Sequence, residues 1–479
     1  MNLLVIDVGT SSIRAAIVRP GAGVTVSRHH PLLPDSPAPG LVEFDARAMA
    51  EAVLDLGRAV LAEGGPVDAV GITNQRASAV VWDRATGEPV GPGIGWQDLR
   101  TVIDCLTLGA QGVRLAPNLT ATKAAHLLDL ADPDRTRDLC IGTVDSWLVW
   151  TLTGGARHVT DVTNVGLTGL RTADQLEWDQ RVLDALRIPT AALPEVVDSS
   201  GVIGEATALP GAPPIAGILG DQQASLLGQG CVAPGDAKIT FGTGGMLDLC
   251  LSERPTFATQ GSGGTFPIVT RGLGGQRRWG LEAVMLAAGT NVEWLRDDLG
   301  IIADAAESHA VAAACADTDG VAYVPALLGL GTPTWDYGAR GALLGITRGT
   351  GRPQIVRAVL EGVANRAADL VEAAEADGGL AIPTLRIDGG MSDNPTFVQA
   401  LANATGRSVE VSPERESTTL GAAYAAGLAL GAWADEAEIA GTWTPRAVVE
   451  PAAKVDRERW ADTLRRAERW HPELSAISF

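Results

Sequence analysis

The first residues that could do chemistry lie between two apolar runs at the start of the chain. The runs 3–6 and 13–18 have the composition of buried β-strands, and the gap between them is too short for a crossover helix. The sequence therefore predicts a β-hairpin with a polar turn, which by itself is either an ordinary turn or a ligand site. Hydroxyl and amide donors beside an arginine suit phosphate oxygens, and a carboxylate can hold a hydrated metal cation. The residues concerned are Asp7, Gly9, Thr10, Ser11, Ser12 and Arg14.

The same layout returns in the second half of the chain. Residues 237–250, AKITFGTGGMLDLC, comprise an apolar strand, a turn from Gly242 to Gly245 and a second apolar strand. A repeat at such a long separation indicates two similar domains, each beginning with a phosphate-facing hairpin. Two such turns facing each other across a cleft would hold a polyphosphate between them.

An acid–base candidate lies at the end of another apolar run. Residues 215–219 are predicted to form a strand, Gly220 and Asp221 end it, and Gln222 begins a helix. A carboxylate at a helix N-terminus stays ionised and can accept a proton. Asp221 is therefore either a general base or a simple helix N-cap, which is the commonest role of aspartate at such a place.

The elements that must position these residues follow from hydrophobic periodicity. We expect helices over residues 48–63, about 281–299 and 353–375, and a hairpin over 78–90. Asp145 is expected to cap a helix. The polar clusters 73–76, 160–164 and 388–390 either follow buried strands, where α/β proteins place ligands, or reflect turn chemistry.

Composition excludes several classes of protein. The chain has 479 residues, enough for two to three domains, and a net charge of −20, which disfavours nonspecific binding of nucleic acid or anionic membranes. The chain begins directly with a predicted strand, and none of its apolar runs reaches transmembrane length. We therefore expect no signal peptide and no insertion into a membrane. The five scattered cysteines form no C-x-x-C pair, so we expect a cytoplasmic protein without disulfides or zinc.

Common nucleotide and hydrolase motifs are missing from the sequence. It contains no G-x-x-x-x-G-K-[ST] loop, and no G-x-G-x-x-G follows the first strand. It also lacks G-x-S-x-G and any metalloprotease motif. A phosphate-binding role must therefore rest on the two hairpins.

Over nearly its whole length the chain resembles the FGGY carbohydrate kinases. The resemblance rests on IDVGTSSIR, GITNQRASAVVWDRATGEPV, GTVDSWLVW, GDQQASLLGQ, FGTGG and RIDGGMSDNPTFVQALANATG, and on residues 341–361. One family signature fits poorly: in TATKAAHLLD, Lys123 is present, but Ala124 and His126 replace a bulky apolar residue and a tryptophan. Within the family, the similarity is greatest to members that phosphorylate glycerol.

The resemblance implies a fold and a set of roles. It implies an α/β protein of two actin-like (ribonuclease H-like) domains with the active site in the cleft between them. Residues 1–233 would bind the polyol or sugar, and residues 234–479 the nucleotide. ATP and Mg²⁺ would be the cofactors, with Asp7 placing the metal and Asp221 acting as general base. The remaining nucleotide-binding residues would be Thr10, Ser11, Ser12, Arg14 and Thr243 at the phosphates, and Gly289, Gly390 and Asn394 at the adenosine.

The acceptor pocket departs from the family pattern. Arg76, Trp96 and Gln222 match the family's substrate ligands. The carboxylate expected after the arginine is Ala77 instead, the expected tyrosine is Asn118, and the expected phenylalanine is Met246. A lost carboxylate leaves substrate hydroxyls without an acceptor, and the first two changes also remove volume.

We therefore predict an ATP-dependent kinase of a polyol or ketose of about four to five carbons. Phosphorylation of glycerol itself, to glycerol 3-phosphate, is the alternative. A nucleotide-binding module without catalysis and an ATP hydrolase on the same fold are the rivals, and Asp221 and the set Arg76, Trp96 and Gln222 argue against them. The expected partners are the small-molecule substrate and, by resemblance, a second copy in a homodimer, but no nucleic acid.

Overall fold

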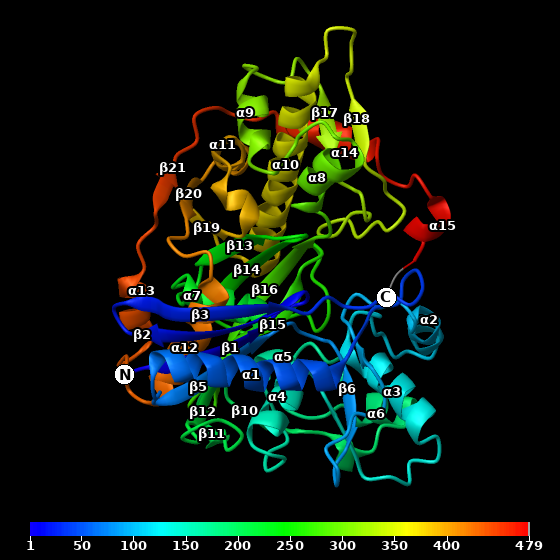
Figure 1. Cartoon of the computed structure of the whole chain (residues 1–479). Coiled ribbons are helices and arrows are strands. Elements are labelled where there is room, and N and C mark those ends of the chain that lie inside the picture. Colours follow the sequence, from blue (N-terminus) through cyan, green and yellow to red (C-terminus); the bar gives the residue numbers. More distant parts are fainter. Residues whose placement is uncertain (478–479) are drawn as a thin grey trace.

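The computed structural model describes residues 1–477, and a single large sheet organises them (Figure 1). The sheet has 13 strands in the order β21-β20-β19-β13-β14-β16-β15-β11-β12-β5-β1-β2-β3. Strands from the first half of the chain form one end of the order and strands from the second half form the other. The two ends meet where β11 pairs with β15.

The elements of the first half comprise six strands of the large sheet (β1, β2, β3, β5, β11 and β12), smaller paired strands and the intervening helices. They are β1 (Leu3–Val8), β2 (Ser12–Arg19), β3 (Gly23–Pro31), β4 (Glu43–Phe44), α1 (Ala46–Gly64), β5 (Ala69–Asn74), β6 (Val80–Asp83), β7 (Gly93–Ile94), α2 (Val102–Ala110), α3 (Thr120–Ala131), β8 (Leu139–Gly142), α4 (Val144–Leu152), β9 (Val159–Asp161), α5 (Val162–Val165), α6 (Gln180–Leu186), η1 (Thr190–Ala192), β10 (Glu195–Val197), β11 (Ser200–Glu205), β12 (Pro214–Gly220) and α7 (Asp221–Gly228).

The second half again begins with a hairpin. Its elements are β13 (Ala237–Phe241), β14 (Gly245–Leu251), β15 (Phe266–Leu273), β16 (Gln276–Met285), α8 (Thr290–Glu293), η2 (Trp294–Asp298), α9 (Glu307–Ala313), β17 (Ala322–Val324), β18 (Ala342–Leu344), α10 (Arg352–Gly378), β19 (Thr384–Asp388), η3 (Gly390–Asp393), α11 (Pro395–Thr405), β20 (Ser408–Val411), α12 (Ser417–Ala429), α13 (Glu436–Thr442), β21 (Ala447–Val449), α14 (Arg457–Arg465) and α15 (Pro472–Ser475).

Both predicted hairpins are present, and their surroundings repeat. β1 pairs antiparallel with β2 and parallel with β5, while β13 pairs antiparallel with β14 and parallel with β19. A further parallel strand follows on the same side in each half, β12 beside β5 and β20 beside β19. The repeat seen in the sequence is therefore a repeat of topology.

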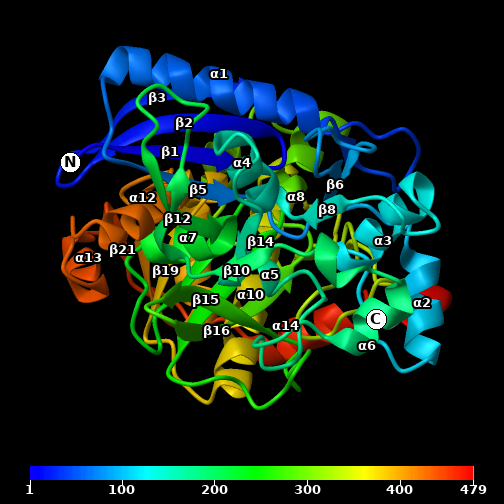
Figure 2. The same ribbon diagram turned by 90° about the horizontal axis from the view of Figure 1, so that it is seen from below.

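The first strand is a continuous apolar run from Leu3 to Ile6 because helices cover both of its faces. Leu4 and Ile6 belong to the same core as residues of α1, and Leu3 and Val5 share a core with residues of α12. Figure 2 shows α1 and α12 on opposite sides of β1. A strand buried on both faces loses the alternating pattern and becomes a continuous apolar run.

Helix α12 packs unusually close to α7, and glycine makes this possible. A Cβ added to Gly421 would lie 1.8 Å from the carbonyl oxygen of Ala224, and one added to Gly228 would lie 1.9 Å from that of Ser417. Backbone therefore meets backbone at this contact. The contact fixes α7, whose first residue is Asp221, against the second half of the chain.

Several predicted elements need correction. The helix expected at about 281–299 is wrong, because β16 continues to Met285 in register with β14 and only α8 and η2 follow it. Asp145 is not a cap: Thr143 is the N-cap residue of α4. The expected hairpin 78–90 is present as a short one: Asp83 donates its N–H to the carbonyl of Glu88 and Val90 to that of Val81, while the longer ladder of β6 is with β8. The helices expected over 48–63 and 353–375 are confirmed as α1 and α10.

Within residues 1–477, no helix combines the length and the apolar character needed to span a bilayer.

Candidate active site

Asp221 lies at the junction of β12 and α7, with its carboxylate partly exposed. The N-cap residue is Gly220, so Asp221 begins the helix and the N-cap interpretation is wrong. Its Oδ1 accepts a hydrogen bond from the backbone N–H of Gln222 at 2.8 Å and lies 3.2 Å from Nε of Arg76. Burial raises the pKa of Asp221, and the charge of Arg76 opposes this rise. The result is a carboxylate that can take a proton from a hydroxyl.

Arg76 follows the end of β5 and holds three side chains at once. Besides Asp221, its Nη2 lies 2.7 Å from a carboxylate oxygen of Glu282, and its Nη1 donates to Oε1 of Gln223 at 3.2 Å. The guanidinium is only 10% exposed. Its position is therefore fixed, as an orienting group requires.

Three charged residues cross the sheet of the second half in one row. Lys238 of β13 faces Asp248 of β14 in register, and Asp248 faces Glu282 of β16. Nζ of Lys238 lies 2.7 Å from Asp248 and donates to Oε1 of Gln222 at 2.7 Å. Sequence analysis missed this row. The available signal was a single charge in each of two otherwise apolar strands, Lys238 in β13 and Asp248 in β14, whereas β16 carries two arginines besides Glu282.

Two of the residues predicted to bind the acceptor lie by this charged row, and a third is linked to the first hairpin. Met246 lies two positions from Asp248 on the same face of β14, and Gln222 reaches that row through Lys238. On the other side, the Trp96 indole N–H donates to Oγ1 of Thr10 at 3.1 Å, which joins the predicted acceptor site to the first hairpin.

Ala77 is hydrogen-bonded to the first residue of α3, which lies two positions after Asn118. Ala77 is buried, with φ of 61°, and its carbonyl accepts a hydrogen bond from Thr120 at 3.2 Å. A non-glycine residue in the left-handed region is costly and is often found at functional sites. The exposed Asn118 is anchored through its carbonyl by the buried Lys123, at 2.7 Å, and burial lowers the pKa of Lys123 to about 7.

Asp7 of the first hairpin meets the start of α12. Burial raises its pKa to about 6, partly offset by Arg14, whose Nη1 lies 3.8 Å away. The hydroxyls of Thr418 and Thr419 donate to its Oδ2 at 3.2 and 3.4 Å. Arg14 also pairs with Glu416. The two halves of the molecule therefore meet at the predicted metal residue.

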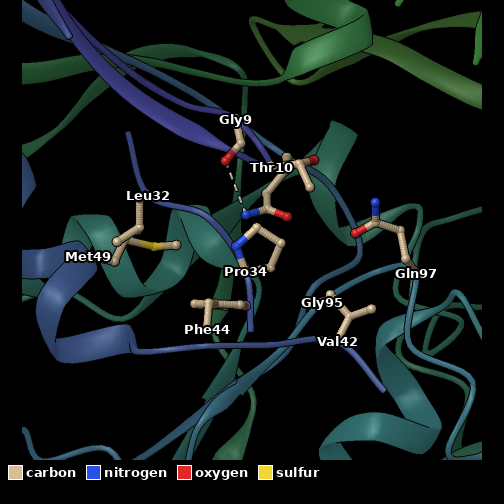
Figure 3. Close-up of a pocket in the computed structure, with 10 residues that line it drawn as sticks. Gly9, Thr10, Leu32, Pro34, Val42, Phe44, Met49, Gly95 and Gln97 are labelled. Atoms are coloured by element: carbon tan, nitrogen blue, oxygen red, sulfur yellow. Dashed lines mark hydrogen bonds between the residues drawn. The ribbon is translucent and has the colours of Figure 1, made fainter. Parts of the chain in front are cut away.

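The turn of this hairpin borders a small hollow (Figure 3). Gly9 donates its N–H to the carbonyl of Ser12 at 2.9 Å, which closes the turn, and Ser11 is exposed beside it. Thr10 and Gln97 lie at the polar side of the hollow. Its apolar side consists of Leu32, Pro34, Val42, Phe44 and Met49.

The remaining nucleotide-binding candidates lie at one edge of the second sheet half. Thr243 is exposed at the turn after β13, and its carbonyl accepts from Thr290 at 2.7 Å. A Cβ on Gly289 would lie 2.6 Å from the carbonyl oxygen of Gly242, so α8 touches this turn. Gly390 is exposed after β19, the parallel neighbour of β13. The Asn394 side chain caps α11 and donates to Ser308 at 2.9 Å.

A buried polar network stands behind Asp221. The N–H of Gly220 donates to Oγ1 of Thr163 at 2.9 Å, and that hydroxyl donates to the carboxylate of Asp161. Asp161 is the N-cap of α5 and lies against Asp145, whose pKa burial raises to about 7. The network fixes the end of β12, from which Asp221 follows.

Comparison with known proteins identifies the family. The N-terminal domain of the FGGY family of carbohydrate kinases matches residues 2–228, and its C-terminal domain matches residues 237–430. A glycerol kinase of Trichlorobacter lovleyi is 42% identical over 480 residues, covering 96% of each chain, and glycerol kinase 2 of Thermotoga maritima is 40% identical, covering 98% of this chain and 99% of that one.

Solved structures agree with this assignment. A Plasmodium falciparum glycerol kinase crystallised with ADP superposes with a TM-score of 0.90 at 27% identity, covering 100% of this chain and 99% of that one. A xylulose kinase of Lactobacillus acidophilus has the same fold, with a TM-score of 0.83 at 21% identity, covering 98% and 97%. The predicted two-domain α/β fold is confirmed, and the chain belongs to the FGGY family of carbohydrate kinases, which transfer a phosphoryl group from ATP to an alcohol.

Proposed function

We propose that this kinase phosphorylates a hydroxyl of a polyol or ketose of four to five carbons, with Asp221 as general base. The observation that carries the proposal is the Asp221 carboxylate, which is partly exposed at the start of α7 and is oriented by Arg76 at 3.2 Å. A module that only binds nucleotide needs no such base.

The reaction follows from positioning and charge. Asp221 accepts the proton as the substrate oxygen attacks the γ-phosphorus, and the bond to the leaving ADP breaks in line. Arg76 holds the carboxylate in place, and Trp96 and Gln222 bind the rest of the acceptor. Thr10, Ser11, Ser12 and Arg14 bind phosphates from the first hairpin and Thr243 from the second, while Gly289, Gly390 and Asn394 line the adenosine.

Asp7 is the proposed Mg²⁺ residue. Mg²⁺ usually takes one or two protein carboxylates and completes its coordination with water and substrate phosphates. A lone carboxylate fits that pattern, and within residues 1–477 no cluster of three or more potential metal-ligating side chains offers another site. Bound Mg²⁺ would neutralise charge on the phosphates.

The preference for a longer acceptor rests on the pocket. Ala77 and Asn118 are small where the family pattern has larger side chains. Smaller side chains at these two positions would leave room for an acceptor one or two carbons longer than glycerol.

Glycerol is the second candidate substrate. It is favoured by curated relatives named glycerol kinase at 40–42% identity over nearly the full chain. If glycerol is preferred, the changes at positions 77, 118 and 246 are tolerated in a site for the smaller triol.

The deciding experiment measures ADP release with Mg·ATP across triols, tetritols, pentitols and ketoses, using Asp221→Asn as control. We expect one four- or five-carbon compound to give the highest kcat/KM, and the variant to lose about 10²- to 10⁴-fold, the usual contribution of a general base. Preference for glycerol would contradict the longer acceptor. ADP release that is independent of acceptor, or unchanged in the variant, would contradict the mechanism.

The proposal also covers the domain boundary, the cellular compartment and the assembly of the protein. We place the domain boundary at residue 233, between α7 and β13, with the acceptor domain before it and the nucleotide domain after it. Five free cysteines, four of them buried, suit the reducing cytoplasm. A homodimer is the proposed assembly, which light scattering would test.

A further inference from the structure

A carboxylate from the second half of the chain lies where the altered pocket lacks one. In the family pattern a glutamate follows the arginine, but here that residue is Ala77. On Arg76 itself, however, the Glu282 carboxylate lies 2.7 Å from Nη2, while Asp221 lies 3.2 Å from Nε. Glu282 and Asp221 therefore share one guanidinium.

Ion pairing alone does not account for Glu282. It lies directly across from Asp248, and like charges at facing positions of two strands are destabilising. The charged groups that act on it are Arg76, Asp248 and Lys238, and Asp221 shares Arg76 with it. With Glu282 included, three carboxylates meet two cations, and burial with the neighbouring Asp248 raises the pKa of Glu282 to about 7.

Such a carboxylate is well suited to receive hydrogen bonds from a neutral polyol. The three carboxylates have only two cations as partners. A substrate hydroxyl would give Glu282 an additional hydrogen-bond donor without adding a charge. The side chain of Glu282 is 10% exposed. Its partner across the ladder is Asp248 of β14, and two positions from Asp248 on that strand is Met246, a half-buried residue predicted to bind the acceptor. Through Arg76, which also holds Asp221, the carboxylate lies next to the group proposed to take the proton from the acceptor.

We propose that Glu282 is a specificity-determining residue whose carboxylate binds an acceptor hydroxyl other than the one phosphorylated, in place of the carboxylate missing at position 77. This inference rests on the proposed function of the site. Because Arg76 belongs to the first half and Glu282 to the second, the acceptor contacts both halves at once.

The test combines Glu282→Gln with monodeoxy analogues of the best acceptor from the substrate panel. If Glu282 binds one hydroxyl, the variant loses about 10- to 100-fold in kcat/KM for the full acceptor, the range for a hydrogen bond to a charged group. The analogue lacking that hydroxyl loses a similar factor with wild-type protein. When Glu282→Gln is measured with that analogue, kcat/KM falls no further than with either change alone, because both remove the same hydrogen bond.

Additive losses for every analogue would overturn the inference, as would equal increases in KM for ATP and acceptor. Glu410→Gln is the matched control, because it removes the carboxylate of another arginine pair, Arg386–Glu410 at 3.2 Å, on β20. It should leave the analogue pattern unchanged. Glu282→Asp, which keeps the charge but shortens the reach, replaces the glutamine variant if that variant does not fold.

Failure of the proposed function gives a different result. If no compound in the panel is phosphorylated, the thermal shift produced by the acceptors is measured instead, with Mg·ADP as a reference ligand. A shift with acceptor that Glu282→Gln removes, while the Mg·ADP shift persists, supports the contact without turnover. No difference between variant and wild type overturns it.

Discussion

At the scale of single residues, this site is defined by buried charge whose balance depends on neighbours distant in sequence. Arg76 joins Asp221 and Glu282, while Lys238 joins Asp248 and Gln222. Removing one member leaves another charge buried without its partner, which costs more than the pair contributes. Substitutions here therefore need isosteric replacements to be interpretable.

Asp145 provides a residue-scale prediction for stability. Its folded pKa of about 7 exceeds its ordinary value of 3.8, so between these pH values the native state holds a proton that the unfolded chain has lost. Stability therefore falls as pH rises through this window, by up to about 1.4 kcal/mol per pH unit. Asp145→Asn, which cannot titrate, should flatten this slope in urea unfolding measured from pH 4 to 8.

Asp55→Asn is the control, since that carboxylate is 79% exposed and should leave the slope unchanged. Equal slopes for wild type and Asp145→Asn would show that Asp145 is already ionised in the native state.

At the scale of elements, the contact of α7 with α12 positions the proposed base. The helices touch through backbone at Gly421 and Gly228, so a side chain there must displace main chain rather than a flexible side chain. A shift of α7 would move Asp221, its first residue. Packing of two helices is in this way linked to catalysis.

Gly421→Ala tests this link. We expect a loss of about 1–3 kcal/mol in stability from overpacking, together with lower kcat, because its Cβ would meet the carbonyl oxygen of Ala224 at 1.8 Å. Gly441→Ala in α13 is the matched control. Its Cβ would meet nothing within 4 Å, and alanine favours a helix by up to about 1 kcal/mol. Equal melting temperatures for the two variants would contradict the close packing.

At the scale of the whole molecule, the two halves are not independent bodies. Helix α12 comes from the second half of the chain, yet it covers a face of β1, β5 and β12 in the first. Apolar residues of these strands, including Leu3, Val5 and Leu219, are buried beneath it. Without α12 that face would be exposed to water.

Expression of residues 1–233 alone should therefore give insoluble or aggregating protein. Co-expression with residues 234–479 should restore a soluble complex, measured by gel filtration and circular dichroism. A soluble fragment 1–233 with a cooperative thermal transition would contradict this prediction. The full chain should melt in a single transition.

Local pattern alone predicted the two hairpins, their repetition, helices α1 and α10 and the strand-to-helix junction at Asp221. These features depend on residues close in sequence, whose periodicity and turn chemistry are visible directly. The apolar stretch after residue 281 was mistaken for a helix, since a buried strand and a helix cannot be separated by hydrophobicity when both are apolar. Its register with β14 decided the outcome.

The sequence by itself determined the family, the reaction class and the candidate base, because these rest on motifs whose residues are adjacent. Only the tertiary structure placed Glu282 and Asp221 on one arginine, and Lys238, Asp248 and Glu282 in one row. Strand register and the meeting of two halves bring together residues more than 200 positions apart, such as Arg76 and Glu282. No local pattern contains that proximity, and the absence of a carboxylate at Ala77 could not reveal where another one lies.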